Sequence, residues 1–135
     1  MSGWQPKKDK GEPVQDQPKL EDKATLHIRA DKGEVIASWR TTVLLDEGKY
    51  RLQALARASQ VAALTNQLDR GNGAGLRVSG NKRTQQLVGD AAWTQLEHEF
   101  EVMPGGEDKE LVCELRARQG EVWFDASSLR LLRVK

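Results

Sequence analysis

Residues 111–125 read LVCELRARQGEVWFD, and the alternation of apolar and polar side chains in this stretch decides the fold class. Apolar residues occupy every second position over 111–117 and again at Val122 and Phe124. Successive side chains of a β-strand point to opposite faces of the sheet, so a period of two is typical of a strand with one buried face. Gly120, between the two runs, indicates a tight turn. The stretch therefore predicts two consecutive half-buried strands.

The same period returns along most of the chain. Alternating segments, separated by turns rich in Gly, Asp and Asn, lie at 24–30, 39–45, 50–58, 76–79, 85–88, 93–102 and 129–134. Residues 61–68 are the one stretch that suits either a short helix or a loop. About eight short strands with almost no helical period predict an all-β protein, an antiparallel β-sandwich of jelly-roll type.

The N-terminal segment has a different composition. Residues 5–23 contain three of the four prolines, five lysines and five acidic residues, and their only large apolar side chains are Val14 and Leu20. Such a segment buries too little apolar surface to offset the entropy lost on ordering. The sequence thus predicts a poorly ordered polar arm over 1–23 and a β-sandwich domain over 24–135.

Composition also excludes several classes of partner and cofactor. The 135 residues include 21 Lys and Arg against 20 Asp and Glu, a formal net charge of +1, which provides no overall field to attract nucleic acid. No apolar run approaches the roughly 20 residues of a membrane span. One cysteine and two histidines make neither a disulfide nor a three-histidine metal centre. We therefore expect no nucleic acid, no membrane, no metal and no cofactor.

Three blocks of the sequence resemble a known family. Residues 39–52 are similar to its block of a tryptophan, a β-branched pair, an apolar run, a turn and then Gly-x-Tyr-x-Leu. Residues 93–102 resemble its W-x-x-L-x-x-x-F-x-V strand, and residues 120–129 its closing G-x-V-W-F-D-x-x-x-L signature. Gly3-Trp4 is similar to a Gly-Trp pair near the family's start. The family is that of galactose-binding-like jelly-roll carbohydrate-binding modules, and the resemblance covers about 24–135.

The resemblance also raises the question of a structural calcium ion. In the family, a Glu on a strand before the Gly-Trp pair helps to bind calcium together with the Asp of the closing signature. The printed sequence keeps that aspartate as Asp125 but not the strand that carries the Glu. One carboxylate falls far short of the six to eight oxygens that calcium takes. We therefore predict no metal ligand here, and a calcium ion near Asp125 is left open.

Strand geometry selects Trp123 as the candidate ligand-binding residue. If Val122 and Phe124 face the core, Trp123 between them faces outward. An exposed indole is a stacking platform for the apolar C–H face of a sugar ring. Arg116 and Arg118 alternate with the apolar residues of the preceding strand, so they are expected to face outward as well. Guanidinium groups bind hydroxyls and carboxylates. The expected ligand contacts are therefore Trp123, Arg116 and Arg118.

The remaining aromatic and titratable side chains are given structural roles. Trp39 and Trp93 match positions that the resembling family fills with core or edge-packing side chains, so we expect them in the core. His98 shares the inward parity of its strand and is expected to be partly buried, whereas His27 alternates outward and is expected to be exposed. Cys113 lies in an inward row and is expected to be buried and unreactive.

The sequence favours binding over catalysis. It has no G-x-S-x-G elbow, no phosphate-binding loop and no H-E-x-x-H motif. Its carboxylates at 97, 99 and 101 alternate with core residues, as in a solvated strand face. A hydrolase would require two outer carboxylates in one cleft with a raised pKa. We therefore predict a non-catalytic carbohydrate-binding domain of a larger protein; the alternative is a structural or protein-interaction module that docks another protein domain.

Overall fold

The computed structural model describes residues 3–64, 72–81 and 85–134. Within these residues, ten β-strands pair antiparallel and a 3-10 turn, η1 (Ala126–Ser128), is the only helical element. No helix in this part of the chain is long and apolar enough to cross a membrane. The strands are β1 (Gln5–Lys10), β2 (Val14–Asp16), β3 (Lys19–Leu20), β4 (Lys23–Ala30), β5 (Val35–Leu45), β6 (Gly48–Ala63), β7 (Gly73–Val78), β8 (Gly89–Val102), β9 (Glu107–Asp125) and β10 (Arg130–Val134).

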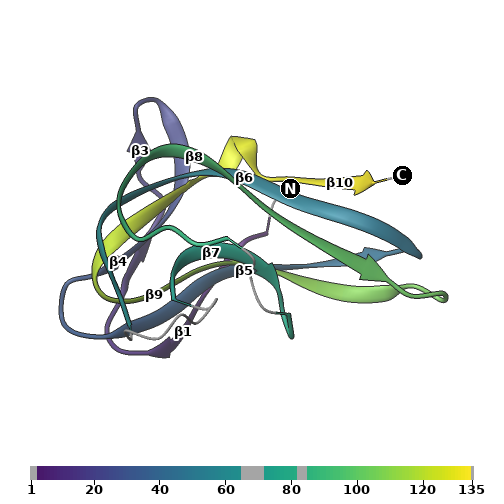
Figure 1. Ribbon diagram of the computed structural model, residues 1–135, viewed down its shortest axis with the longest axis horizontal. Coiled ribbons are helices and arrows are strands. Elements are labelled where there is room, and N and C mark those ends of the chain that lie inside the picture. The colour runs from purple at the N-terminus through teal and green to yellow at the C-terminus, as the bar shows by residue number, and fades with distance from the viewer. Residues whose placement is uncertain (1–2, 65–71, 82–84, 135) are drawn as a thin grey trace.

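Two long strands, β6 and β9, each pair with different neighbours along their length and so connect two facing layers. The first part of β9 lies between β5 and β7, and its last part lies between β4 and β6. The first part of β6 in turn lies between β8 and β10. Figure 1 shows the result: β6, β8 and β10 lie in one layer, and β1, β5 and β9 lie in the other. The predicted all-β antiparallel fold is confirmed.

The core fills the space between the two layers. The inward rows predicted from the period of two are found there, and Val122 and Phe124 are fully buried. Trp39 and Cys113 are buried as expected.

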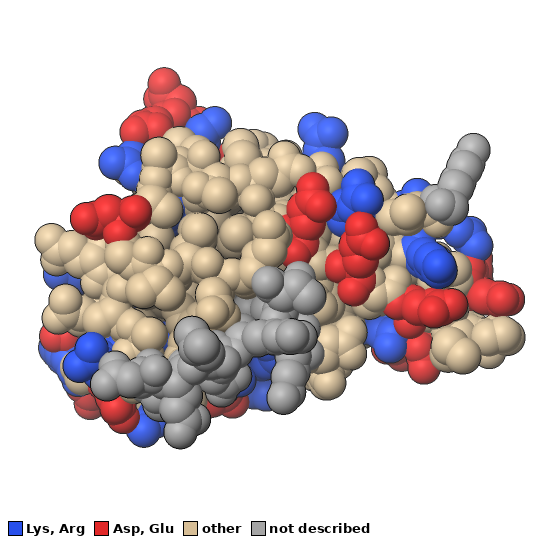
Figure 2. Space-filling model, viewed as in Figure 1, with Lys and Arg blue, Asp and Glu red and all other residues tan. Residues whose placement is uncertain are grey.

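At the surface shown in Figure 2, acidic and basic side chains alternate and no large area carries a single sign. This agrees with the balanced charge of the sequence.

The turn predicted at Gly120 is wrong, because β9 runs through this residue without a break. Ala117 and Val122 both face the core although they are five residues apart, so the strand needs one extra residue to restore the alternation. The pairing with β6 is irregular here: its register shifts between Ser59 and Ala62, and again between Ala62 and Ala63, where β9 carries the extra residue. Gly120 has a φ of +103°, and a Cβ there would lie 2.5 Å from the Gln60 carbonyl oxygen. A β-bulge at a glycine thus replaces the turn.

Gly120→Ala is therefore expected to destabilise the protein by about 2–3 kcal/mol, from the positive φ and the clash together. Gly33 provides a matched control: its φ is +102°, but a Cβ there would meet nothing within 4 Å. Gly33→Ala should cost only about 1 kcal/mol, the conformational part alone. Urea unfolding measures both free energies. Equal losses in the two variants would contradict a close backbone approach at Gly120.

The N-terminal segment is more closely attached than the sequence predicted. β1 pairs with β5, β2 pairs with β4, and β3 joins β4 through a two-residue turn. Trp4, just before β1, is 8% exposed. The six side chains of β1 are all exposed, as their composition indicates. Backbone hydrogen bonds hold the segment to one edge of β5 and one edge of β4. Side-chain composition gives no information on such bonds.

Candidate functional site

Trp123 lies on the outer side of the sheet, as the strand parity predicted. It is half-buried, while its neighbours Val122 and Phe124 are fully buried on the opposite side. On β4, directly across from Trp123, the ring of His27 stacks on the indole with centroids 5.1 Å apart and planes at 19°. On β6, the residue across from Trp123 is Arg57. The indole is therefore partly open to solvent, with His27 against one of its faces.

The prediction that His27 is exposed is wrong: it is 6% exposed. Its Nδ1 lies 2.6 Å from Asp16 Oδ1, and its Nε2 lies 2.8 Å from Glu121 Oε1. Each nitrogen of the ring therefore faces a carboxylate oxygen at hydrogen-bond distance. His27 alternates outward as predicted, but two carboxylates and the indole of Trp123 cover it. The contact ties β2 to β4 and β9 and fixes the Trp123 ring.

Trp93, predicted to lie in the core, is half-buried on the outer surface. Its Nε1 donates a hydrogen bond of 2.9 Å to Glu21 Oε2. The other oxygen of that carboxylate accepts a hydrogen bond of 2.6 Å from Arg57 Nη1. Lys23 Nζ lies 5.7 Å from the centre of the Trp93 ring, within range of a cation–π interaction. We call Glu21, Arg57 and Trp93 the saddle, because the carboxylate of Glu21 bridges the other two side chains.

The position of Glu21 depends on the turn between β3 and β4. Glu21 and Asp22 have φ values of +52° and +65°, the left-handed conformation of a two-residue hairpin turn that usually favours Asn and Gly. Non-glycine residues in this region raise the energy of the fold and concentrate at functional sites. The hydrogen bond from Trp93, followed by the positive charge of Arg57, lowers the pKa of Glu21 below its ordinary value. The saddle therefore holds Glu21 as a carboxylate.

A depression of about 480 Å³ opens beside the saddle. Three small apolar side chains, Ala58, Ala91 and Ala92, line it together with the polar side chains of Ser59 and Asp90. Asp90 Oδ1 accepts a hydrogen bond of 2.8 Å from the Gln60 backbone amide. The depression thus combines an aromatic ring, a flat apolar surface and convergent polar groups, the mixture typical of sites for small polar ligands.

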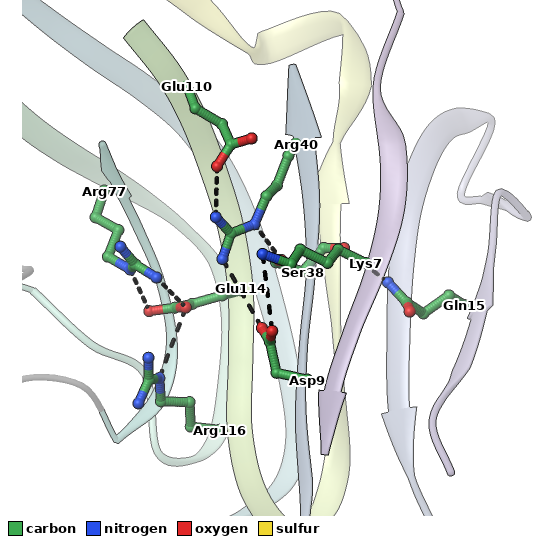
Figure 3. Close-up of polar contacts among 9 residues, drawn as sticks. All are labelled: Lys7, Asp9, Gln15, Ser38, Arg40, Arg77, Glu110, Glu114 and Arg116. Atoms are coloured by element: carbon green, nitrogen blue, oxygen red, sulfur yellow. Dashed lines mark hydrogen bonds and ion pairs between the residues drawn. The ribbon is translucent and has the colours of Figure 1, made fainter. Parts of the chain in front are cut away.

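The other two predicted contacts lie elsewhere on β9. Arg116 Nε is 3.6 Å from Glu114 Oε2, and Arg77 Nε donates a hydrogen bond of 2.9 Å to Glu114 Oε1, so the two guanidinium groups flank one buried carboxylate (Figure 3). Arg118 Nε donates to the Ala63 carbonyl oxygen at 3.0 Å. Seven residues separate Arg116 from Trp123, a distance of about 23 Å along the strand. The structure does not bring them together, and ligand contact by Arg116 and Arg118 stays a prediction.

A second group of polar contacts in Figure 3 fastens the N-terminal segment to the sheet. Arg40 on β5 donates hydrogen bonds to Glu110 Oε1 at 2.5 Å and to Ser38 Oγ at 2.8 Å, and it lies 3.9 Å from Asp9 of β1. Gln15 of β2 donates to the Ser38 carbonyl oxygen at 2.8 Å. These contacts give the segment structural anchors but place no open ligand site there.

The residues around Asp125 do not fit a calcium ion. Asp125 is 2% exposed, and its Oδ1 accepts hydrogen bonds from the Ser127 amide and hydroxyl at 3.0 and 2.8 Å. Lys23 Nζ lies 3.7 Å from Oδ2. An ammonium group at this position repels a divalent cation, and the described ranges contain no group of three His, Cys, Asp or Glu side chains placed to hold a metal. Asp125 instead caps η1 and neutralises Lys23.

His98 is more deeply buried than expected, at 3% exposure. Its Nε2 lies 3.5 Å from Asn81 Nδ2, and its Nδ1 has no hydrogen-bond partner in the part of the chain that the structure describes. Burial, followed by the positive charge of Arg77, lowers the pKa of His98 below 6.5. Burial therefore favours the neutral form of the ring.

This shift predicts a specific acid sensitivity. The unfolded chain takes up a proton at His98 near pH 6.5 and the folded chain only at the lowered pKa, so stability is complete above 6.5 and decreases as the pH falls toward the lowered value. The slope is about 1 kcal/mol per pH unit. His98→Leu should remove this part of the slope, as urea unfolding at pH 7.5 and 5.5 would measure. Any contribution of His27 is the same in wild type and in the variant, so it does not affect the difference between them. Equal dependence of stability on pH in the two proteins would contradict the prediction.

Comparisons with known proteins place the fold. No protein family matches the sequence, and no curated protein matches it. The solved structure of TmCBM61 in complex with β-1,4-galactotriose is similar, with a TM-score of 0.60 and 17% identity over 98% of this chain and 90% of that chain. The enzymatically active domain of tailspike protein 4 from bacteriophage CBA120 is similar with a TM-score of 0.66 and 12% identity, over 98% of this chain but 20% of that chain.

At these identities the likeness defines the fold. The chain has an all-β fold similar to that of TmCBM61, which agrees with the fold that the resemblance of its three sequence blocks implied. The same fold is found within a much longer tailspike chain, so the fold by itself does not decide between binding and catalysis.

Proposed function

We propose that the chain is a non-catalytic carbohydrate-binding domain that binds its ligand at the saddle and in the depression beside it. The observation that carries this proposal is the part-exposed Trp93 ring, fixed by Glu21 next to a floor of alanines. A sugar ring presents apolar C–H groups and hydroxyls together. The indole and the alanines can pack against the C–H groups, and the carboxylates and the Arg57 guanidinium can form hydrogen bonds with the hydroxyls.

Trp123 is proposed as a neighbouring contact. It lies across from Arg57 on the adjacent strand, so it borders the saddle. His27 covers one of its faces, and the contact it offers a sugar is therefore smaller than that of Trp93. Support for a sugar as the ligand class comes from the fold neighbour TmCBM61, which was solved with a galactotriose bound. As a single small domain, the chain suits the role of an accessory module in a larger protein.

The electrostatics of the saddle favour binding over hydrolysis. Glu21 and Asp90 line the same depression, so two carboxylates do share a cleft. Glycoside hydrolysis requires that one carboxyl act as a general acid, and its pKa must be raised for that role. The pKa of Glu21 is lowered instead. Glu21 is therefore unsuited to act as the general acid of a glycoside hydrolase.

Affinity electrophoresis tests the proposal. Native gels containing β-1,4-galactan, arabinoxylan or mixed-linkage β-glucan should retard the chain relative to a gel without polysaccharide, at least in one case. An assay for new reducing ends on the retarding polysaccharide should stay at background. If no gel retards the chain, sugar binding is wrong and the protein-interaction alternative is favoured. If reducing ends accumulate, the non-catalytic part of the proposal is wrong.

A further inference from the structure

Three depressions follow the outer side of one strand, β6. The first, of about 250 Å³, is lined by Gln53 and Leu55 together with Gln95 and Arg130 from the flanking strands β8 and β10. The second is the depression beside the saddle, which begins two residues further along β6. The third, of about 270 Å³, shares Ser59 with the second and continues past Gln60 to the outer side of β4 and β9. Together they form a row, which we call the β6 furrow.

The length of the furrow exceeds a single sugar ring. Gln53 and Gln60, at its two ends, are seven residues apart on β6, a distance of about 23 Å in an extended strand. The furrow is bordered by other strands along its sides, and it passes over the saddle near its middle. A ligand that uses all three depressions must therefore be a chain that enters at one end and leaves at the other.

The furrow carries no excess of positive charge. Three arginines and four carboxylates line the three depressions. Arg57 is paired with Glu21 at 2.6 Å, and Arg29 lies 3.4 Å from Asp31. An anionic chain would gain no free guanidinium from these two pairs, and it would meet the carboxylate of Asp90, whose hydrogen bond comes from a backbone amide and not from a cation. At the first depression, the amides of Gln53 and Gln95 and the apolar surface of Leu55 match hydroxyls and C–H groups instead.

We propose that the ligand is an internal stretch of a neutral polysaccharide that lies along the β6 furrow. This inference rests on the proposed function and adds the direction, the length and the charge of the ligand. The saddle provides the central contact, and the two outer depressions bind the sugar units on either side.

Isothermal titration with oligosaccharides of increasing length tests the inference. The probes are the mono-, tri- and hexasaccharide of whichever polysaccharide retards the chain in the gels. Affinity should rise by about tenfold or more from the mono- to the hexasaccharide, because additional units reach the outer depressions. If the monosaccharide binds as tightly as the hexasaccharide, the furrow is wrong while the saddle remains a sugar site. If none of the three binds, the proposed function fails as well.

Variants at the ends of the furrow separate it from the saddle. The double variant Gln53→Ala with Gln95→Ala removes both amides of the first depression, and Gln119→Ala removes one from the third. Each should weaken hexasaccharide binding by about threefold to tenfold and leave the monosaccharide within about twofold of wild type. An oxidised, carboxylated form of the same polysaccharide should bind about tenfold more weakly than the neutral form. Loss of monosaccharide binding in the end variants, or tighter binding of the oxidised form, would overturn the inference.

Discussion

Trp93→Ala is expected to weaken polysaccharide binding by about tenfold to a hundredfold, the largest effect on binding of any single substitution in the chain. The substitution removes the stacking surface, and it also removes the N–H group that holds Glu21 in the saddle. Isothermal titration with the hexasaccharide measures the loss. Because Trp93 is only half-buried, thermal unfolding should show a modest decrease in stability.

Two further variants separate stacking from the position of Glu21. Trp93→Phe keeps an aromatic face but cannot donate to Glu21, and it should retain most of the affinity if stacking dominates. Thr94→Ala changes the next residue of the strand, whose hydroxyl donates a hydrogen bond to the Ala92 carbonyl oxygen of the same strand, and this variant should bind as wild type does. Trp93→Ala with unchanged affinity would remove the saddle as the site. In that case Trp123→Ala decides whether the neighbouring indole is the platform.

Glu114→Gln is expected to destabilise the protein by about 3–5 kcal/mol, the largest loss of stability among the polar substitutions. Glu114 is 1% exposed and lies between Arg77 and Arg116, and the Arg77 side chain is itself only 12% exposed. Glutamine keeps the shape but removes the charge that compensates two guanidinium groups. Breaking such a pair leaves a cation without a counterion in a dry environment, and this costs more than the pair itself contributes.

The neighbouring carboxylate gives a matched control. Glu110 lies four residues before Glu114 on the same strand and pairs with Arg40. The Glu110 side chain is 38% exposed, and Arg40, itself 11% exposed, has a second carboxylate, Asp9, at 3.9 Å, so solvent and Asp9 can replace the lost interaction. Glu110→Gln should therefore cost less than about 1 kcal/mol. Urea unfolding of both variants at pH 7 measures the difference. Similar losses in the two variants would show that burial does not determine the effect of Glu114.

The strands and the outward position of Trp123 could be predicted from the sequence because both depend on a period of two within one strand. The positions that were predicted wrongly involve more than one strand. Trp93 was expected in the core, but the pairing of β8 with β6 is irregular near this residue and places its ring outside. His27 alternates outward as predicted, yet carboxylates from β2 and β9 cover it.

Glu21 gave no signal in the sequence as a site residue. It lies in a polar segment whose composition predicted a poorly ordered arm, and its partners Arg57 and Trp93 are 36 and 72 residues further along the chain. Backbone pairing of β3 with β4 brings it to them. An alternating pattern records which side chains avoid water, but it contains no information on which strand edges meet.

The lysines of β1 have a consequence for behaviour at high concentration. β1 pairs only with β5 in the described part of the sheet, so its other border offers unpaired backbone groups to solvent. Lys7, Lys8 and Lys10 line this border together with Pro6, which lacks an amide hydrogen. If two copies approached along this border, their lysines would repel one another and Pro6 would interrupt the backbone hydrogen bonds between the two strands. Both features commonly oppose fibril growth. The segment that composition predicts to be poorly ordered therefore carries features that oppose the joining of neighbouring chains into a continuous sheet.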